Sequence, residues 1–242
     1  MSADAAAKPK AKSPRLQSRQ AKTRTRLLEA AYRLMSKKGV NDTAIQEITD
    51  LADVAFGTFY NYFVSKDDIA AQVLDCVIRA LGDRNVEANR EAAVTDPVLI
   101  VANSVRLVAQ EMMQNPIWRW WVQRPDLVVE RMRDGFKPFG LYDMQKAVEA
   151  GVYKIAGDDQ ETAWSFLIWL LAGGIKDILD GRRPPSAEGL IAESIMRVMG
   201  VDRAKAQAVA KQPLPQVQKL KISFAWTRLA RSTAVGSNLD LG

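Results

Sequence analysis

An aromatic, hydroxyl-bearing segment in the first third of the chain combines side chains that could contact a nucleic acid. Asn61 can hydrogen-bond to an adenine edge, and the rings of Phe56 and Tyr60 can touch thymine methyl groups. Thr58 and Tyr62 carry hydroxyl groups that suit phosphate oxygens. The pattern therefore favours contact with a nucleic acid over a plain solvated surface.

Helical spacing divides the aromatic side chains of this segment between two faces. Phe59 and Phe63 are four residues apart and share one face, so we expect them to pack inward. Phe56 and Tyr60 are also four apart and share a different, uncharged face. A simpler alternative is that all four rings fill a small helical core, and we accept it for the first pair alone.

Sequence signals on either side of this segment predict the helices that would position it. Helical periodicity begins at Gln20 and stops at Gly39, and residues 43–46 form a capping-box pattern that starts a second helix. A break at residues 53–54 leads into a compact third helix, and a second capping box at residues 65–68 opens a long one. Two short helices joined by a tight turn predict a helix-turn-helix, whose second helix enters the DNA major groove.

Two further features of this region suit phosphate binding. Lys66 lies at the start of the long helix, where its ammonium and the free backbone N–H groups could clasp a phosphate, and Thr43 also lies at a helix start. Residues 1–40 contain eleven Lys or Arg and two acidic residues, so this arm could follow the minor groove. A solubilising tail explains the first dozen residues equally well. The candidate residues of the arm are Arg15, Arg19, Lys22, Arg24 and Arg26.

The stretch Gly57-Thr-Phe-Tyr-Asn-Tyr-Phe63, followed by Ser65 and Lys66, resembles the signature of TetR-family regulators. The resemblance covers about residues 20–70 and includes the preceding framework residues, Thr43, Ile48 and Ala52. It implies a homodimer on a palindromic double-stranded DNA operator, usually repressing, and released when a small molecule binds the helical body. It places Phe56, Gly57, Tyr60 and Asn61 near bases, and Thr43, Thr58, Tyr62 and Lys66 near phosphates.

Two positions depart from the family pattern. Asp53 stands in the turn where Gly is usual, although Asp tolerates turn geometry and could cap the following helix. Ala55 stands where Ser or Thr is frequent, which removes one candidate phosphate contact. Both changes could alter the operator sequence or the affinity for it.

The remainder of the chain also shows helical periodicity, which predicts an all-α fold with a three-helix head and a larger helical body. Within the C-terminal extension, residues 202–211 and 214–231 are predicted as short helices. The predicted parts are a disordered basic arm (1–19), a helix-turn-helix domain (20–66), a ligand-binding and dimerisation domain (67–200) and an extension (201–242) that ends disordered.

The predicted helices at residues 159–180 and 186–199 are candidates for a dimer surface. Gly173 and Gly174 let two helices approach closely, and Trp169 supplies apolar area. Packing of these helices within one subunit is nearly as good an explanation of the residues alone. The family resemblance, in which the last two body helices pair with those of the partner, favours the dimer.

Six tryptophans occur in the chain, and five of them lie in the predicted body. Aromatic and Met side chains at helical spacing are more often core than ligand pocket, but bundles line their pockets with the same residue types. The resemblance implies an apolar small-molecule effector, for which aromatic, steroid-like and long-chain acyl compounds all stay open. The candidate lining residues are Met112, Trp118, Trp121, Arg124, Phe136, Phe139, Trp164 and Trp169.

The composition argues against catalysis and metal binding. The chain contains no His, and its single Cys76 excludes an internal disulfide and a Cys-based zinc site. It shows no nucleophile motif, no Gly-rich phosphate loop and no paired-carboxylate pattern. We therefore expect a protein that is not an enzyme, with no catalytic residue, cofactor or metal.

The longest apolar run, residues 166–175, is too short to span a bilayer, and the N-terminus lacks the apolar stretch of a signal peptide. A cytoplasmic protein with no membrane partner is expected. Two other functions stay open. One is a DNA-binding activator or architectural protein without a ligand, and the other is a helical lipid-binding module that no longer binds DNA.

Overall fold

The computed structural model of the protein describes residues 14–225, which contain helices and no strand, so the predicted all-α class is confirmed. The α-helices are α1 (Pro14–Lys38), α2 (Ile45–Leu51), α3 (Lys66–Glu91), α4 (Pro97–Gln114), α5 (Pro116–Val122), α6 (Pro125–Glu149), α7 (Gln160–Leu179), α8 (Glu188–Val198) and α9 (Arg203–Lys211). Three short 3₁₀ helices are η1 (Phe56–Asn61), η2 (Ala156–Asp158) and η3 (Pro185–Ala187).

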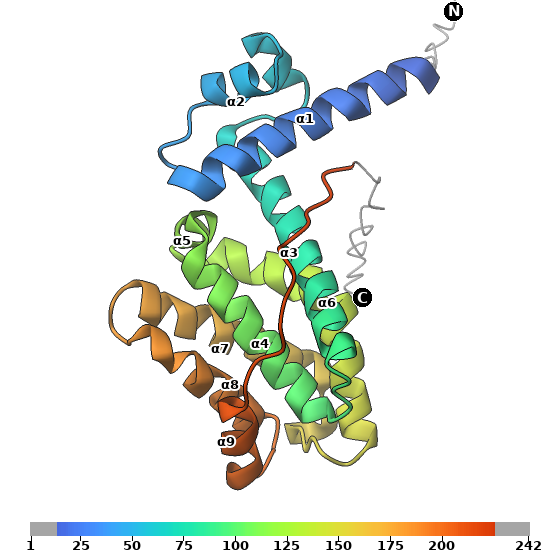
Figure 1. The fold of residues 1–242 in the computed structure, drawn as a ribbon, viewed down its shortest axis with the longest axis vertical. Coiled ribbons are helices and arrows are strands. Elements are labelled where there is room, and N and C mark those ends of the chain that lie inside the picture. The colour runs from blue at the N-terminus through green and yellow to red at the C-terminus, as the bar shows by residue number, and fades with distance from the viewer. Residues whose placement is uncertain (1–13, 226–242) are drawn as a thin grey trace, which may run out of the picture.

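The head consists of α1, α2, η1 and the first turns of α3, and it lies at one end of the molecule (Figure 1). Its small core is built from Leu27 and Leu28 of α1, Ile48 of α2, and Phe59 and Phe63, all nearly or fully buried. Phe59 and Phe63 therefore pack inward, as their spacing predicts. Helix α1 begins six residues before the predicted start at residue 20, and its first turns project beyond the head (Figure 1).

Helix α3 continues from the head into the body, where α4 is the central element and packs against α3, α6, α7, α8 and α9. The side chain of Ser65 caps α3 by accepting from the Asp68 N–H, and Asp96 caps α4 in the same way through the Val98 N–H. The cap predicted at residues 65–68 is thus present. Because α3 belongs to both parts, a change in the body can reach the head through one continuous helix.

Short helix α5 forms a second contact between head and body. It packs against α1, and the Trp120 indole donates to the side-chain oxygen of Asn41 at 2.8 Å. Trp118 and Trp121 of α5 are fully buried or nearly so. The tryptophans of α5 therefore form part of the core between the head and the body.

Beyond α9 the chain runs in an extended path along the body towards α1 (Figure 1). Residues 214–225 form no helix, so the helix predicted there is wrong within the described range, and its remaining residues, 226–231, lie outside that range. Two prolines, Pro213 and Pro215, start the segment, and each removes a backbone donor and disfavours helix in the residue before it. The segment instead lies on the body surface.

Helix α7 is long and apolar enough to cross a membrane by length and composition, and it is the one such helix among residues 14–225. Within the fold it packs against α4, α6 and α8. A core helix of a bundle passes the same test of length and composition.

Candidate nucleic-acid interface and effector cavity

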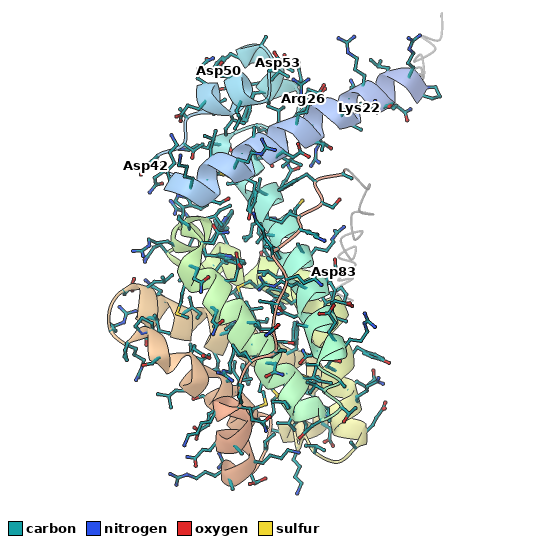
Figure 2. All side chains as sticks on the ribbon, viewed as in Figure 1. Lys22, Arg26, Asp42, Asp50, Asp53 and Asp83 are labelled. Atoms are coloured by element: carbon teal, nitrogen blue, oxygen red, sulfur yellow. The ribbon has the colours of Figure 1, made fainter. Side chains whose placement is uncertain are left out.

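A tight turn between α2 and η1 sets the direction of the recognition element. Asp53 occupies this turn with a φ of 50°, in the left-handed region that Asp tolerates better than most residues. The Arg26 guanidinium donates to both the Asp53 carbonyl, at 3.0 Å, and its carboxylate, at 2.9 Å. The Asp53 side chain therefore anchors the turn to α1. It does not cap η1, because the N-cap residue of that helix is Ala55, which makes no side-chain cap hydrogen bond. Figure 2 shows this pair at the junction of α1 and the turn.

The outer face of η1 presents the residues predicted to face bases. Phe56 and Tyr60 are 45% and 53% exposed, and Gly57 and Asn61 are exposed beside them. The rings of Phe56 and Tyr60 lie edge to face, with their centroids 5.8 Å apart. The Tyr60 ring also contacts the buried Phe59 ring, with 5.3 Å between centroids. The inward aromatic residues thus hold the outward ones in position.

The residues predicted to contact phosphates differ in their accessibility. Thr58 and Tyr62 are half-buried at the edges of η1. The Lys66 ammonium lies at the N-terminus of α3 and donates to the Asn41 carbonyl at 3.0 Å. Thr43 is buried, and its hydroxyl donates to the Gly39 carbonyl at 2.7 Å.

The cap of α2 differs from the predicted capping box at residues 43–46. The helix begins at Ile45, and its N-cap is Ala44, which has no side-chain acceptor. The Glu47 carboxylate accepts from the Ala44 N–H at 2.8 Å and also pairs with the Lys38 ammonium at 2.6 Å. Of the two hydrogen bonds of a capping box, only the one from the N-cap N–H to the Glu47 carboxylate is present, one residue later than predicted. The Thr43 hydroxyl is not available for the other bond because it donates to the Gly39 carbonyl.

The basic residues of α1 separate into free and anchored groups. Arg15, Arg19 and Lys22 are exposed on the part of α1 nearest its N-terminus. Arg24 is half-buried: it hydrogen-bonds to the Gln72 side chain and lies 5.5 Å from the centroid of the Phe63 ring. Burial lowers the pKa of the Arg24 guanidinium. Arg24 therefore joins α1 to α3 in this structure, while the other three remain open to solvent.

A cavity of about 60 Å³ lies inside the body between α3, α4, α6 and α7. Phe136, Phe139 and Trp164, three of the eight predicted ligand residues, line it. Two glycines shape its aromatic walls: a Cβ at Gly82 would lie 2.3 Å from the Phe139 ring, and one at Gly140 would lie 2.5 Å from the Trp164 ring. The absence of side chains at these positions on α3 and α6 thus lets the two rings approach the helix backbones closely.

The other five predicted ligand residues lie outside this cavity. Met112, Trp118 and Trp121 are buried in the core near α5. Arg124 stacks over the Trp120 ring at 3.8 Å. Trp169 is 49% exposed on α7.

Sequence reasoning missed the polar lining of the cavity, which comes from Asn85 and Ser104, on α3 and α4, and from Asp143 on α6. The apolar residues Val101, Val105, Val108, Met144, Leu167, Ile168 and Leu171 complete much of the wall. A polar residue inside an otherwise apolar helical stripe, as at Asn85, is the sequence signal that could have pointed to it.

An apolar stripe remains uncovered on the outer face of α7 and α8. Phe166, Trp169 and Leu170 are 53%, 49% and 36% exposed on α7, and Leu190 and Val198 are 58% and 47% exposed on α8. The spacing of three, four and eight residues places each set on one side of its helix. These are the helices predicted to form the dimer surface.

No group of three or more His, Cys, Asp or Glu within residues 14–225 could hold a metal ion. Cys76, the single cysteine, is partly buried, and burial raises the pKa of its thiol.

Two family profiles match the chain, one in each part of the fold. Residues 27–73 match bacterial regulatory proteins of the tetR family, and residues 96–212 match the tetracyclin repressor-like C-terminal domain. The second match ends one residue after α9, so the extended segment lies beyond it.

Two curated regulators are similar to part of the chain. The HTH-type transcriptional regulator LuxR of Vibrio harveyi is 25% identical over 115 residues, 46% of this chain and 55% of that protein. The HTH-type transcriptional repressor DhaR of Mycobacterium sp. (strain GP1) is 34% identical over 80 residues, 33% of this chain and 40% of that protein. The chain thus spans about half the length of the curated relatives it matches.

Solved structures extend the likeness over both parts. The crystal structure of RolR in complex with its ligand resorcinol superposes with a TM-score of 0.76 and 25% identity, covering 84% of this chain and all of that one. A TetR regulator from Rhodococcus sp. RHA1 has a TM-score of 0.54 and 23% identity over 75% of this chain and 97% of that one, which shows the fold alone. With its head and body each matched by a profile of the same regulators, the chain belongs to the TetR family of bacterial regulatory proteins.

Proposed function

We propose that the protein is a homodimeric transcriptional regulator that binds a palindromic operator through η1 and leaves the DNA when a small apolar effector fills the body cavity. The observation that carries the proposal is the exposed, uncharged face of Phe56, Gly57, Tyr60 and Asn61 on an element whose other face is buried. Family membership supplies the context, and the exposure of these four residues supports the choice of surface.

Phosphate contacts contribute affinity around this reading face. Thr58, Tyr62 and Lys66 border it, and Arg15, Arg19 and Lys22 extend a basic row along α1. Thr43 is buried, and its hydroxyl and its N–H donate to the carbonyls of Gly39 and Val40, so it supports the predicted phosphate contact less than the other residues do. Because the reading face carries no charge, operator affinity should depend mainly on phosphates and fall steeply with salt.

The uncovered stripe of α7 and α8 supports the dimer. Two copies of the same stripe can form an isologous four-helix interface, which buries large apolar side chains that are exposed in one protomer. A two-fold dimer presents two copies of η1 to successive major grooves, about 34 Å apart.

The cavity supports the effector. RolR was solved with resorcinol, and its whole length superposes on this chain. The cavity here lies against α3 and α4, which both lead towards the head, so an occupant could bias the position of the head. DhaR is a transcriptional repressor, and its similarity favours repression as the sign of regulation here. We propose a regulatory rather than a catalytic role, carried out on DNA in the cytoplasm.

Replacing Tyr60 by alanine tests the reading face. Its ring is 53% exposed, so removal should change the melting temperature little, while operator affinity should fall about tenfold or more. The operator is first selected from a random duplex pool with the parent protein, and affinity is then measured by fluorescence anisotropy. Tyr142→Ala, at a tyrosine 59% exposed on α6, is the matched control and should bind like the parent.

Two outcomes would contradict the proposal at different levels. If the parent protein selects no DNA, the regulator assignment fails. If it selects an operator that Tyr60→Ala binds with unchanged affinity, the DNA-binding function stands, but the outer face of η1 does not read the bases.

A further inference from the structure

The buried side chains of Asn85, Asn89 and Asn103 form a hydrogen-bonded network beside the cavity. Two side-chain oxygens of this network accept no hydrogen bond within residues 14–225. The Asn85 amide donates to the Ser104 carbonyl, and the Asn103 amide donates to the Asn89 side-chain oxygen at 3.0 Å. The Asn89 amide is used twice, on the Asn85 carbonyl and the Ser104 hydroxyl. The side-chain oxygens of Asn85 and Asn103 have no partner among the described residues. A buried acceptor without a donor costs free energy, so such a site favours a ligand that brings one.

Asp143, on α6, adds a second acceptor to the cavity lining. Its carboxyl lines the cavity from α6 and makes no hydrogen bond or ion pair within residues 14–225. Burial raises the pKa of this carboxyl, with Lys146 on the same helix opposing the shift. None of the described lining residues is Lys or Arg, so nothing in the cavity wall would neutralise a ligand carboxylate or phosphate.

We propose that the effector is a small, uncharged, single-ring molecule whose hydroxyl groups donate to the Asn85 side-chain oxygen and the Asp143 carboxyl. This inference rests on the proposed function of the cavity and specifies the chemistry of its ligand. The volume of about 60 Å³ corresponds to about four to six water positions, which is the size of one substituted ring. Phe136, Phe139 and Trp164 supply apolar and aromatic walls for its faces. Long acyl chains and carboxylates do not fit this size and charge.

Three matched compounds test this ligand class by titration calorimetry on the full-length protein. Resorcinol has two hydroxyl donors, 1,3-dimethoxybenzene has the same ring with acceptors alone, and benzoate carries a negative charge. We expect resorcinol to bind at least about fivefold more tightly than the dimethoxy compound, and benzoate to bind most weakly. Equal or reversed affinities would overturn the donor requirement while leaving the cavity as the effector site. If none of the three binds, the cavity assignment and this inference both fail.

A pair of variants identifies the acceptor. Asn85→Leu keeps the volume of the side chain but removes its oxygen, and should weaken resorcinol binding about fivefold with no loss for the dimethoxy compound. Asn103→Leu is the control, since Asn103 belongs to the same buried network but is not a lining residue. An equal loss in both variants would assign the effect to packing. If Asn85→Leu does not fold, Asp143→Ala provides the same comparison at the second proposed acceptor.

A second, independent feature is the extended segment of residues 213–225, which we name the strap. Its beginning is held to the body: the Arg106 guanidinium of α4 donates to the Gln212 carbonyl at 2.6 Å and pairs with Glu188 of α8 at 2.9 Å. Further along, the Gln218 side chain donates to Glu91 of α3 at 3.2 Å. Leu220 and Ile222 then pack against the core.

The end of the strap is held to the head. Phe224 is 7% exposed, and its ring lies 5.6 Å from the Tyr32 ring of α1 between centroids. The Thr25 hydroxyl of α1 donates to the Phe224 carbonyl at 3.1 Å. The strap thus joins the far end of the body to α1, a path that neither α3 nor the α1–α5 contact follows (Figure 1).

We infer that the strap restrains the orientation of the head relative to the body. A rotation of α1 away from α4 would stretch an already extended segment or pull the Phe224 ring from its site. The strap lies beyond the part of the chain that the family profile matches, so it is a restraint additional to the common fold. Releasing it should widen the range of head positions without unfolding either part.

Distance measurements between two spin labels test the restraint directly. The labels are placed at Asp50→Cys on the head and Glu149→Cys on the body, both exposed, in a Cys76→Ser chain diluted with unlabelled protein. Phe224→Ala should broaden the distance distribution roughly twofold or shift its mean. Val217→Ala, at an exposed strap residue, is the matched control and should leave the distribution unchanged. A Phe224→Ala distribution identical to that of the control would overturn the inference, and Thr25→Val gives a second, milder test of the same contact.

Discussion

Replacing Phe59 by alanine is expected to lower the free energy of unfolding by about 3–5 kcal/mol, because the ring is fully buried in a small core. Its ring contacts Phe63 at 5.6 Å and Tyr60 at 5.3 Å between centroids, and its carbonyl accepts from the N–H groups of Tyr62 and Phe63. The loss is a large fraction of the stability of an ordinary domain. The melting temperature should therefore fall by on the order of 10 °C.

The same substitution three residues earlier is the control. Phe56 has the same side chain, but 45% of it is exposed, so Phe56→Ala should change stability by about 0.5 kcal/mol or less. Circular dichroism melts of the two variants give the comparison, and operator binding gives the opposite ranking at a temperature where both are folded. Equal losses of stability would mean that the inward and outward faces of η1 are assigned incorrectly.

This contrast shows what the sequence determines in the head. The spacing of four correctly pairs the buried Phe59 with Phe63 and the exposed Phe56 with Tyr60, although the element that carries them is a short 3₁₀ helix. The signal is strong since the segment is short and its neighbours have caps and turns of recognisable type. The exact cap of α2 was harder to predict, because the Thr43 hydroxyl can bond either forwards to α2 or backwards to the Gly39 carbonyl, and the structure has the second bond.

The body cavity was less predictable for a different physical reason. Periodicity shows that an aromatic side chain faces the interior, but not which other helix it meets there. Trp118 and Phe136 give the same pattern, yet the first fills the core at α5 and the second lines the cavity. The cavity depends on close approach at Gly82 and Gly140, which comes from tertiary packing. The extended path of the strap was not predicted, because its apolar residues also suit an amphipathic helix. The two prolines at its start, Pro213 and Pro215, disfavour that helix.

Replacing Trp169 by glutamate is expected to separate the proposed dimer. The side chain is 49% exposed in the protomer, at the middle of the apolar stripe on α7, so the substitution should leave the fold of each subunit intact. In an isologous interface both copies carry the new charge, and each would be buried without a partner. The dimer dissociation constant should therefore rise on the order of 10³-fold or more.

Loss of the dimer should carry through to DNA binding because each protomer has one recognition element. A monomer contacts one half-site, so it loses the gain of bivalent binding, and operator affinity should fall by about 10²–10⁴-fold. Sedimentation velocity measures the first effect and fluorescence anisotropy the second. Leu127→Glu, at an apolar residue 47% exposed on α6, is the matched control and should behave as the parent in both. If the Trp169→Glu protein remains dimeric, the interface does not include this stripe. If it is monomeric and still binds the operator with full affinity, operator binding does not require two copies of η1.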